Sequence, residues 1–183
     1  MTQTAQQSMS VEDFTKRFEE RLRAMSQAHD LLLAGDWRGA AVADLVRESL
    51  KPFIADQPGL EMHGPEVILT ADAAQTLSLV LHELATNAAK FGALTKPEGR
   101  IAVDWQLDEE LVDPRRFRIT WRETGGPAVA PPQKTGFGHE LISSLPEHEL
   151  DAAVTLEYLP GGLFWSIDMP ASGVVIRLVE GAT

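Results

Sequence analysis

One segment of the sequence, residues 81–92, carries polar side chains that recur at helical spacing. Glu83, Asn87 and Lys90 follow one another at intervals of four and three residues, which places them on one face of a helix. The oxygens of Glu and Asn can hold a hard cation such as Mg²⁺, and the Lys ammonium can meet a phosphate. From this segment alone, a solvated helix face with incidental charges is an equally good interpretation.

The same helix carries a second, apolar stripe, about 120° away from the polar one. Its members recur at spacings of four and three and are Leu77, Leu81, Leu84, Ala88 and Phe91. This pattern predicts a long helix over residues 73–91, capped by Asp72, with one buried face and one functional or solvated face.

Two turns that contain glycine follow in the second half of the chain. A strand-like run ends at Glu123 and leads into Gly125 and Gly126, and a Pro-rich loop then leads to Gly136-Phe137-Gly138 and a helix. Glycine permits close approach of the backbone to a ligand, and a helix that starts at such a turn presents N–H groups to an anion. A lone Gly-x-Gly is weak evidence, so the order of the segments carries more weight than either turn.

That order resembles the ATP-binding domain of sensor histidine kinases, whose Bergerat-type fold is shared with Hsp90-like ATPases and type II topoisomerases. The resemblance is closest to the HWE subgroup, which is marked by a His before the catalytic Glu and by a Trp-x-Glu motif. This sequence has both, as His82-Glu83 and as Trp121-Arg122-Glu123. The resemblance extends over residues 11–170.

The resemblance implies a role for each matching residue. Glu83 would orient or deprotonate the attacking group, Asn87 would hold Mg²⁺ on the ATP phosphates, and Lys90 would counter phosphate charge. Glu123 would accept a hydrogen bond from the adenine amino group. The glycines of the two turns, with Phe137 between the second pair, would let the chain approach the base and the phosphates; they are Gly125, Gly126, Gly136 and Gly138.

Two further side chains have two interpretations each, and a third is expected in the core. His82 is a second catalytic candidate, but it is expected to project away from the Glu83 stripe, and packing against a neighbouring segment is favoured. His139 would either touch a phosphate or occupy an exposed helix start. Trp121, at the end of a strand, is expected in the core.

Composition limits the class of protein. The chain has 183 residues, 44% of them hydrophobic, which is enough for one domain with a helical appendage. Its formal net charge of −11 argues against binding to nucleic acid or to an anionic membrane. It has no cysteine, no apolar signal core in Met1–Ser10, and no apolar run that approaches the roughly 18 residues of a membrane span. We therefore expect a cytoplasmic protein without membrane contact.

The periodicity predicts the order of the elements and an α+β fold, a two-layer α/β sandwich. An amphipathic helix over residues 11–34 belongs to a partial dimerisation hairpin (1–36), and residues 37–183 form the ATP-binding domain. Inside that domain we expect a helix over residues 40–53, which stops near Pro52, and another near 138–145. Strands are expected near 60–63, 66–69, 100–107, 115–122, 153–159 and 162–168, and residues 173–179 form either a further strand or a tail.

The phosphoacceptor histidine of such a kinase is not expected in this chain. His29-Asp30 looks superficially suitable, but His29 falls in the apolar stripe of the 11–34 helix, a stripe that needs a partner helix and so predicts a homodimer. The chain is either a fragment of a longer kinase or one that lost its acceptor, and its partner would be a response regulator. A scaffold without ATP binding and an anti-sigma-type Ser/Thr kinase are the alternatives.

Overall fold

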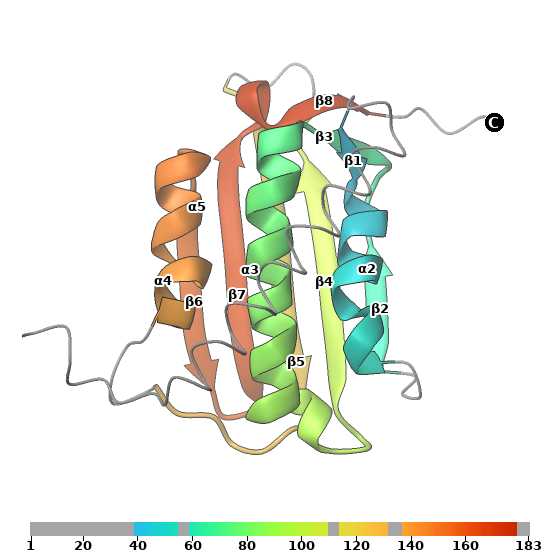
Figure 1. The fold of residues 1–183 in the computed structure, drawn as a ribbon, viewed down its shortest axis with the longest axis vertical. Coiled ribbons are helices and arrows are strands. Elements are labelled where there is room, and N and C mark those ends of the chain that lie inside the picture. The colour runs from blue at the N-terminus through green and yellow to red at the C-terminus, as the bar shows by residue number, and fades with distance from the viewer. Residues whose placement is uncertain (1–38, 55–58, 110–113, 132–136, 179–183) are drawn as a thin grey trace, which may run out of the picture.

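The computed structural model describes residues 39–54, 59–109, 114–131 and 137–178 (Figure 1). Over these ranges, four helices lie on one face of a five-stranded sheet, and a smaller sheet lies at one end of the helical layer (Figure 1). The predicted two-layer α+β sandwich is therefore confirmed. The predicted helix over residues 11–34, with His29 and the proposed hairpin segment 1–36, lies outside the described residues.

The large sheet has the strand order β2-β4-β5-β7-β6. These strands are β2 (Leu60–His63), β4 (Arg100–Leu107), β5 (Arg116–Thr124), β7 (Gly162–Pro170) and β6 (Ala153–Leu159), and each lies within two residues of its predicted bounds. All neighbours are antiparallel except β2 and β4, which run parallel because the long connection between them crosses the helical layer.

The strands bury one face, as their alternating pattern predicts. In β5, every second residue from Phe117 to Glu123 is buried against the helices, and the residues between them face away from the helices. Trp121 is fully buried, which confirms its prediction as a core residue.

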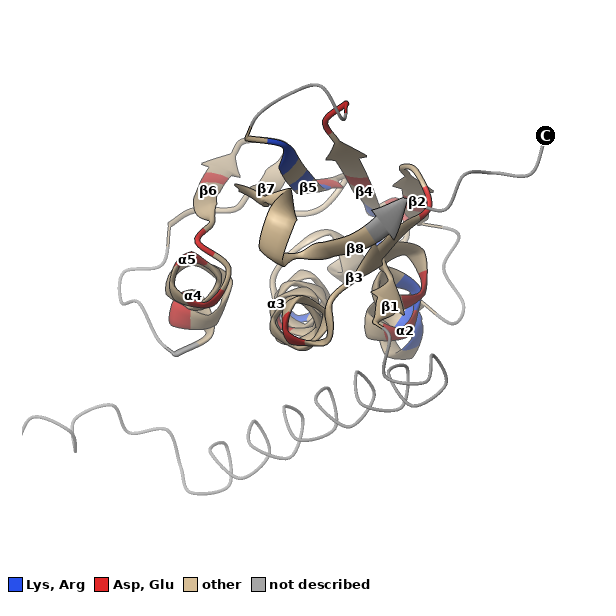
Figure 2. Ribbon diagram, turned by 90° about the horizontal axis from the view of Figure 1, so that it is seen from above, with Lys and Arg blue, Asp and Glu red and all other residues tan. Residues whose placement is uncertain are grey.

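The helices lie side by side along the buried face, with α3 (Ala71–Lys90) in the middle (Figure 2). On one side lies α2 (Val42–Ile54); on the other lie α4 (Phe137–Ile142) and α5 (Ser144–Glu149), which replace the single helix predicted over 138–145. The helix predicted over residues 40–53, with its stop near Pro52, is confirmed: α2 ends at Ile54, and Pro52 lies in its last turn. Packing of the apolar face of α2 against α3 outweighs the backbone hydrogen bond that proline cannot make.

The start of α3 is fixed by a threonine rather than by the predicted Asp72. Thr70 Oγ1 accepts from the N–H of Ala73 at 3.4 Å, while Asp72 lies in the first turn, where its charge favours the helix dipole. Thr70 also donates its N–H to the carbonyl of Val174 at 2.8 Å. The beginning of α3 is thus bound to the segment that leads into the small sheet.

The small sheet consists of β1 (Ala40–Ala41), β3 (Val67–Leu69) and β8 (Val175–Leu178), in the order β1-β3-β8. Both of its pairings are antiparallel. Of the two interpretations of residues 173–179, the strand is therefore the correct one.

The apolar stripe of α3 is one residue shorter than predicted. Leu77, Leu81, Leu84 and Ala88 are buried, but Phe91 is 67% exposed. The helix ends at Lys90, and Phe91 follows as its C-cap with φ −137°, which turns the ring away from the stripe.

Truncation of a stripe residue should destabilise the fold strongly. Leu84 is 0% exposed, so Leu84→Ala is expected to lower the free energy of unfolding by about 2–5 kcal/mol through lost burial and a residual cavity. The matched control is Leu159→Ala, because Leu159 is 43% exposed and its truncation should cost less than about 1 kcal/mol. Urea denaturation measures both, and equal losses would contradict the assignment of α3 as the centre of the core.

Candidate nucleotide site

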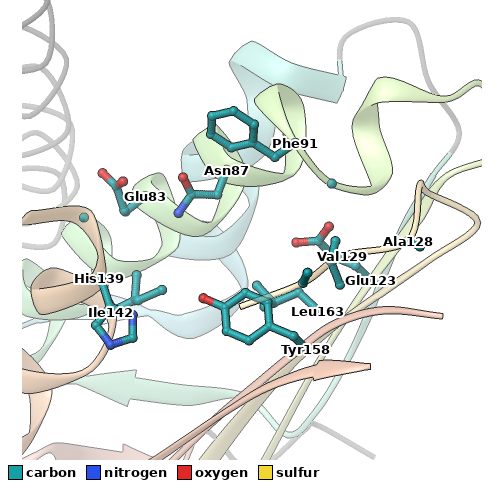
Figure 3. A pocket seen from close by; sticks show the side chains of 13 residues that line it. Glu83, Asn87, Phe91, Glu123, Ala128, Val129, His139, Ile142, Tyr158 and Leu163 are labelled. Carbon is teal, nitrogen blue, oxygen red and sulfur yellow. The ribbon is translucent and has the colours of Figure 1, made fainter. Parts of the chain in front are cut away.

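A cavity of about 530 Å³ lies beside the C-terminal half of α3 (Figure 3). Residues from α3, the end of β5, the following loop, α4, β6 and β7 line it. They are Glu83, Asn87, Phe91, Gly92, Glu123, Ala128, Val129, Ala130, Gly138, His139, Ile142, Tyr158 and Leu163. Six of these thirteen residues have apolar side chains, five have polar ones and two are glycines, so an apolar lining is combined with several polar groups that could orient a small molecule.

One end of the cavity brings together two residues of the polar stripe and the start of α4. Glu83 and Asn87 project from α3, and His139 lies across from them (Figure 3). A Cβ atom at Gly138 would lie 2.2 Å from Glu83 Oε1, so any larger residue would require the Glu83 carboxylate to move. The second glycine of the predicted turn therefore lies against the carboxylate of Glu83.

His139 contributes a polar group to the same end. Its Nδ1 is buried and has no hydrogen-bond partner among the residues that the structure describes. A buried polar atom without a partner carries a free-energy cost, which a ligand that reaches it would relieve. Of the two interpretations of His139, the structure thus rules out a fully exposed helix start.

The other end of the cavity contains a buried carboxylate. Glu123 is 3% exposed, its Oε2 accepts from the N–H of Ala93 at 2.8 Å, and its Oε1 accepts from Nε1 of Trp121 at 3.2 Å. A Cβ atom at Gly92 would lie 2.0 Å from Oε2, so the carboxylate is seated against a glycine. These contacts fix the carboxylate in one orientation beside the cavity.

Burial and hydrogen bonding act on Glu123 in opposite directions. Burial disfavours the ionised form and raises the pKa of Glu123 above its ordinary value of 4.5, and this effect outweighs the hydrogen bonds from Ala93 and Trp121, which lower the pKa. A polar ligand that donates to the carboxylate would add to the stabilisation of its ionised form.

The long wall between the two ends is formed by the sheet. Tyr158 of β6 and Leu163 of β7 lie opposite Asn87, and the Tyr158 hydroxyl points toward the end where Ile142 and His139 lie (Figure 3). Burial raises the pKa of the Tyr158 hydroxyl. Tyr158 was not among the site residues predicted from the sequence, although the alternation of β6 places it on the inward face together with Val154 and Leu156.

Several predicted site residues do not line the cavity. Lys90 is exposed at the end of α3, and His82 packs its ring against Phe53 of α2 with 5.8 Å between ring centroids, as the packing interpretation expects. Gly125 (φ +71°) and Gly126 pack against the backbone of the segment that follows α3. Gly136 lies outside the described residues, and Phe137 is the first residue of α4.

The described residues contain no group of three or more His, Asp or Glu side chains that could hold a metal ion. Among the same residues, no helix is long and apolar enough to cross a membrane.

The pKa of Glu123 predicts a pH dependence of stability. A carboxyl group whose pKa is raised by folding stabilises the fold when protonated; this contribution is complete below the ordinary value of 4.5 and is lost as the pH rises through the raised value. The free energy of unfolding of the parent should therefore fall, relative to that of Glu123→Gln, as the pH rises above 4.5 and through the raised pKa of Glu123.

Urea denaturation at several pH values measures this difference. Glu157→Gln, at an exposed position on β6, is the control for the loss of one negative charge. A pH-independent difference between the parent and Glu123→Gln would show that folding does not raise the pKa of Glu123.

Known proteins resemble this chain in both sequence and fold. Residues 1–66 match the family model of the HWE histidine kinases. A blue-light-activated histidine kinase of Brucella anthropi is 37% identical over 179 residues, which cover 97% of this chain and 36% of the relative. The chain thus spans about a third of the length of the curated relatives that it matches.

Solved structures of histidine kinases share the fold. The histidine kinase domain of the Erythrobacter litoralis EL346 blue-light activated histidine kinase superimposes with a TM-score of 0.60, at 19% identity, over 84% of this chain and 74% of that domain. The catalytic domain of histidine kinase ThkA superimposes with a TM-score of 0.52, at 18% identity, over 71% of this chain and 93% of that domain. Together with the Brucella relatives, these matches identify the chain as a member of the HWE histidine kinase family, with the fold of the histidine kinase catalytic domain.

Proposed function

We propose that this chain is the ATP-binding catalytic part of a sensor histidine kinase and that it transfers the γ-phosphate of ATP to a histidine. The observation that carries the proposal is the arrangement of the cavity. A buried carboxylate, Glu123, lies at one end, and the Glu83–Asn87 pair with Gly138 and His139 lies at the other. A nucleotide needs such a site, with an acceptor for the base at one end and groups for phosphate and metal at the other.

The base of ATP would bind at the Glu123 end. The adenine amino group is a hydrogen-bond donor, and the Glu123 carboxylate is an acceptor with lone pairs beyond those used by Ala93 and Trp121. Leu163 and the ring of Tyr158 supply an apolar wall for the flat faces of the base, and the exposed ring of Phe91 lies at the cavity mouth. Guanine has a carbonyl in place of that amino group, so Glu123 would disfavour GTP.

The phosphates would bind at the Glu83–Asn87 end. Asn87 would offer its carboxamide oxygen to Mg²⁺, and the ion, when bound, neutralises charge on the phosphates. Gly138 leaves room beside Glu83, and the side chain of His139 lies close enough to the cavity to donate to a phosphate oxygen. Gly125, Gly126 and Lys90 stay predicted nucleotide contacts that would need a closer approach of their segments, and Gly136 stays a predicted contact outside the described residues.

Glu83 would act on the attacking imidazole. One ring nitrogen of the acceptor histidine forms the new N–P bond while the bond from the γ-phosphorus to the β–γ bridging oxygen breaks, and ADP leaves. Glu83 would accept the proton of the other ring nitrogen and so orient the nucleophile. His82 has a lesser claim to a catalytic role, because its ring packs against Phe53.

The partners follow from this proposal. We propose that the acceptor is none of the five histidines of this chain, that the chain works in the cytoplasm as a homodimer through the predicted 11–34 helix, and that a response regulator receives the phosphoryl group. A scaffold without ATP binding is the alternative, and the binding experiment below separates the two.

Substitution of Asn87 should weaken the binding of Mg²⁺–ATP. Asn87→Ala removes the proposed metal ligand, so calorimetry should show an affinity that is lower by about tenfold or more, or about 1.4 kcal/mol. Gln75→Ala is the matched control, because it removes a carboxamide from the same helix at a position that does not line the cavity. Absence of ATP binding by the folded parent would favour the scaffold.

Substitution of Glu83 should separate binding from transfer. Glu83→Gln keeps the shape of the side chain but cannot accept the imidazole proton, so it should bind Mg²⁺–ATP and yet lose phosphorylation of an added helical fragment that carries an acceptor histidine. Labelled ATP and a test for acid-labile phosphohistidine provide the measurement. Strong labelling of the chain itself that disappears in His29→Ala would show that the acceptor is His29.

A further inference from the structure

Trp121 makes a contact that its place in the core does not require. It is fully buried on β5, and it precedes Glu123 by two residues, so both side chains lie on the same face of the strand. Its indole Nε1 donates to Glu123 Oε1 at 3.2 Å. A phenylalanine could fill much of the same space, but it could not make this hydrogen bond.

The carboxylate of Glu123 is held by two different parts of the chain. Trp121 on β5 donates to one oxygen, and the backbone N–H of Ala93, just after α3, donates to the other at 2.8 Å. Gly92 lies against Oε2, where any Cβ atom would displace it. With one donor on each oxygen, the plane of the carboxylate is fixed, and a lone pair on each oxygen stays available to a ligand.

We propose that Trp121 is a positioning residue for nucleotide recognition: its indole N–H fixes the orientation in which Glu123 meets the adenine amino group. This inference rests on the proposed function, because it requires that Glu123 binds the base of the nucleotide. Trp121 then acts on the base only through Glu123. This role also explains why a tryptophan precedes Glu123 by two residues, since i and i+2 share one face of a strand.

The hydrogen bond also acts on the charge of the carboxylate. Burial favours the protonated form of Glu123, and the donors Ala93 and Trp121 favour the ionised form, which is the better acceptor for an amino group. Loss of the indole N–H should therefore weaken adenine recognition in two ways: the carboxylate gains freedom to rotate, and its pKa rises further, which favours the protonated form.

Trp121→Phe tests the role of the indole N–H. The variant should bind ATP about tenfold more weakly, the usual effect of losing a hydrogen bond to a charged group, while GTP binding changes less. The matched control is Trp165→Phe. Trp165 is equally buried, pairs with Trp121 across β5 and β7, and donates its N–H to the carbonyl of Ile142 at 2.7 Å instead. The Trp165→Phe variant should lose packing in the core but keep the preference for ATP over GTP.

The double variant Trp121→Phe/Glu123→Gln shows whether the effect passes through Glu123. If it does, Trp121→Phe should reduce the ATP preference in the parent and add little in the Glu123→Gln background. Equal losses for ATP and GTP, or full additivity in the double variant, would overturn the inference and leave Trp121 as a core residue only.

A measurement without nucleotide separates this inference from the proposed function. Carbon-13 labelling of the Glu carboxyl groups reports the titration of Glu123, identified by its loss in Glu123→Gln; Trp121→Phe should move its midpoint to higher pH. The other titratable side chains that line the cavity, Glu83, His139 and Tyr158, are present in every variant compared. An unchanged midpoint would overturn the inference even if ATP binds, whereas a moved midpoint without ATP binding would overturn only the proposed function.

If Trp121→Phe fails to fold, the hydrogen bond can still be tested in the parent protein. The indole N–H resonance of Trp121 should shift along the same pH curve as the Glu123 carboxyl group, because the two groups share a hydrogen bond. This pH dependence should be lost in Glu123→Gln. If the indole resonance does not shift as Glu123 titrates, the hydrogen bond between Trp121 and Glu123 is absent in solution.

Discussion

A carboxylate cannot be buried without hydrogen-bond donors, and this requirement on Glu123 organises the region where the helical layer meets the sheet. One donor, Trp121, comes from β5 itself, and the other, the N–H of Ala93, comes from η1 (Ala93–Thr95), directly after α3. The end of α3 is therefore bound to the central sheet through a single side chain. Because Gly92 must approach that side chain closely, the turn after α3 has little freedom to change.

The position of α3 gives its two stripes their separate roles. One stripe supplies the centre of the core, and the other presents Glu83 and Asn87 to a cavity that the same helix helps to enclose. Burial of the apolar stripe fixes the rotation of the helix about its axis, and this rotation aims the polar side chains at the cavity. Stability and site geometry therefore depend on the same packing, since a rotated α3 would lose both.

The parts of the fold that depend on local pattern could be predicted from the sequence. Alternation located the strands, and the spacing of Glu83 and Asn87 placed both on one helix face. Features set by distant partners could not be predicted in this way. Thr70 caps α3 where Asp72 was expected, and Phe91 leaves the apolar stripe because the helix ends one residue earlier. Alternation places Tyr158 on the inward face of β6, but its position beside the cavity depends on the pairing of β6 with β7.

The small sheet has a consequence for the order in which the domain can fold during synthesis. β3 pairs with β8, so Val67 lies opposite Leu178, and Thr70 at the start of α3 bonds to Val174. When α3 and β4 have emerged from the ribosome, β8 and Val174, which close this end of the molecule, have not yet been synthesised. The helix that carries Glu83 and Asn87 would then complete its anchoring only after residue 178 has emerged, so that the cavity beside this helix forms late rather than on an incomplete domain.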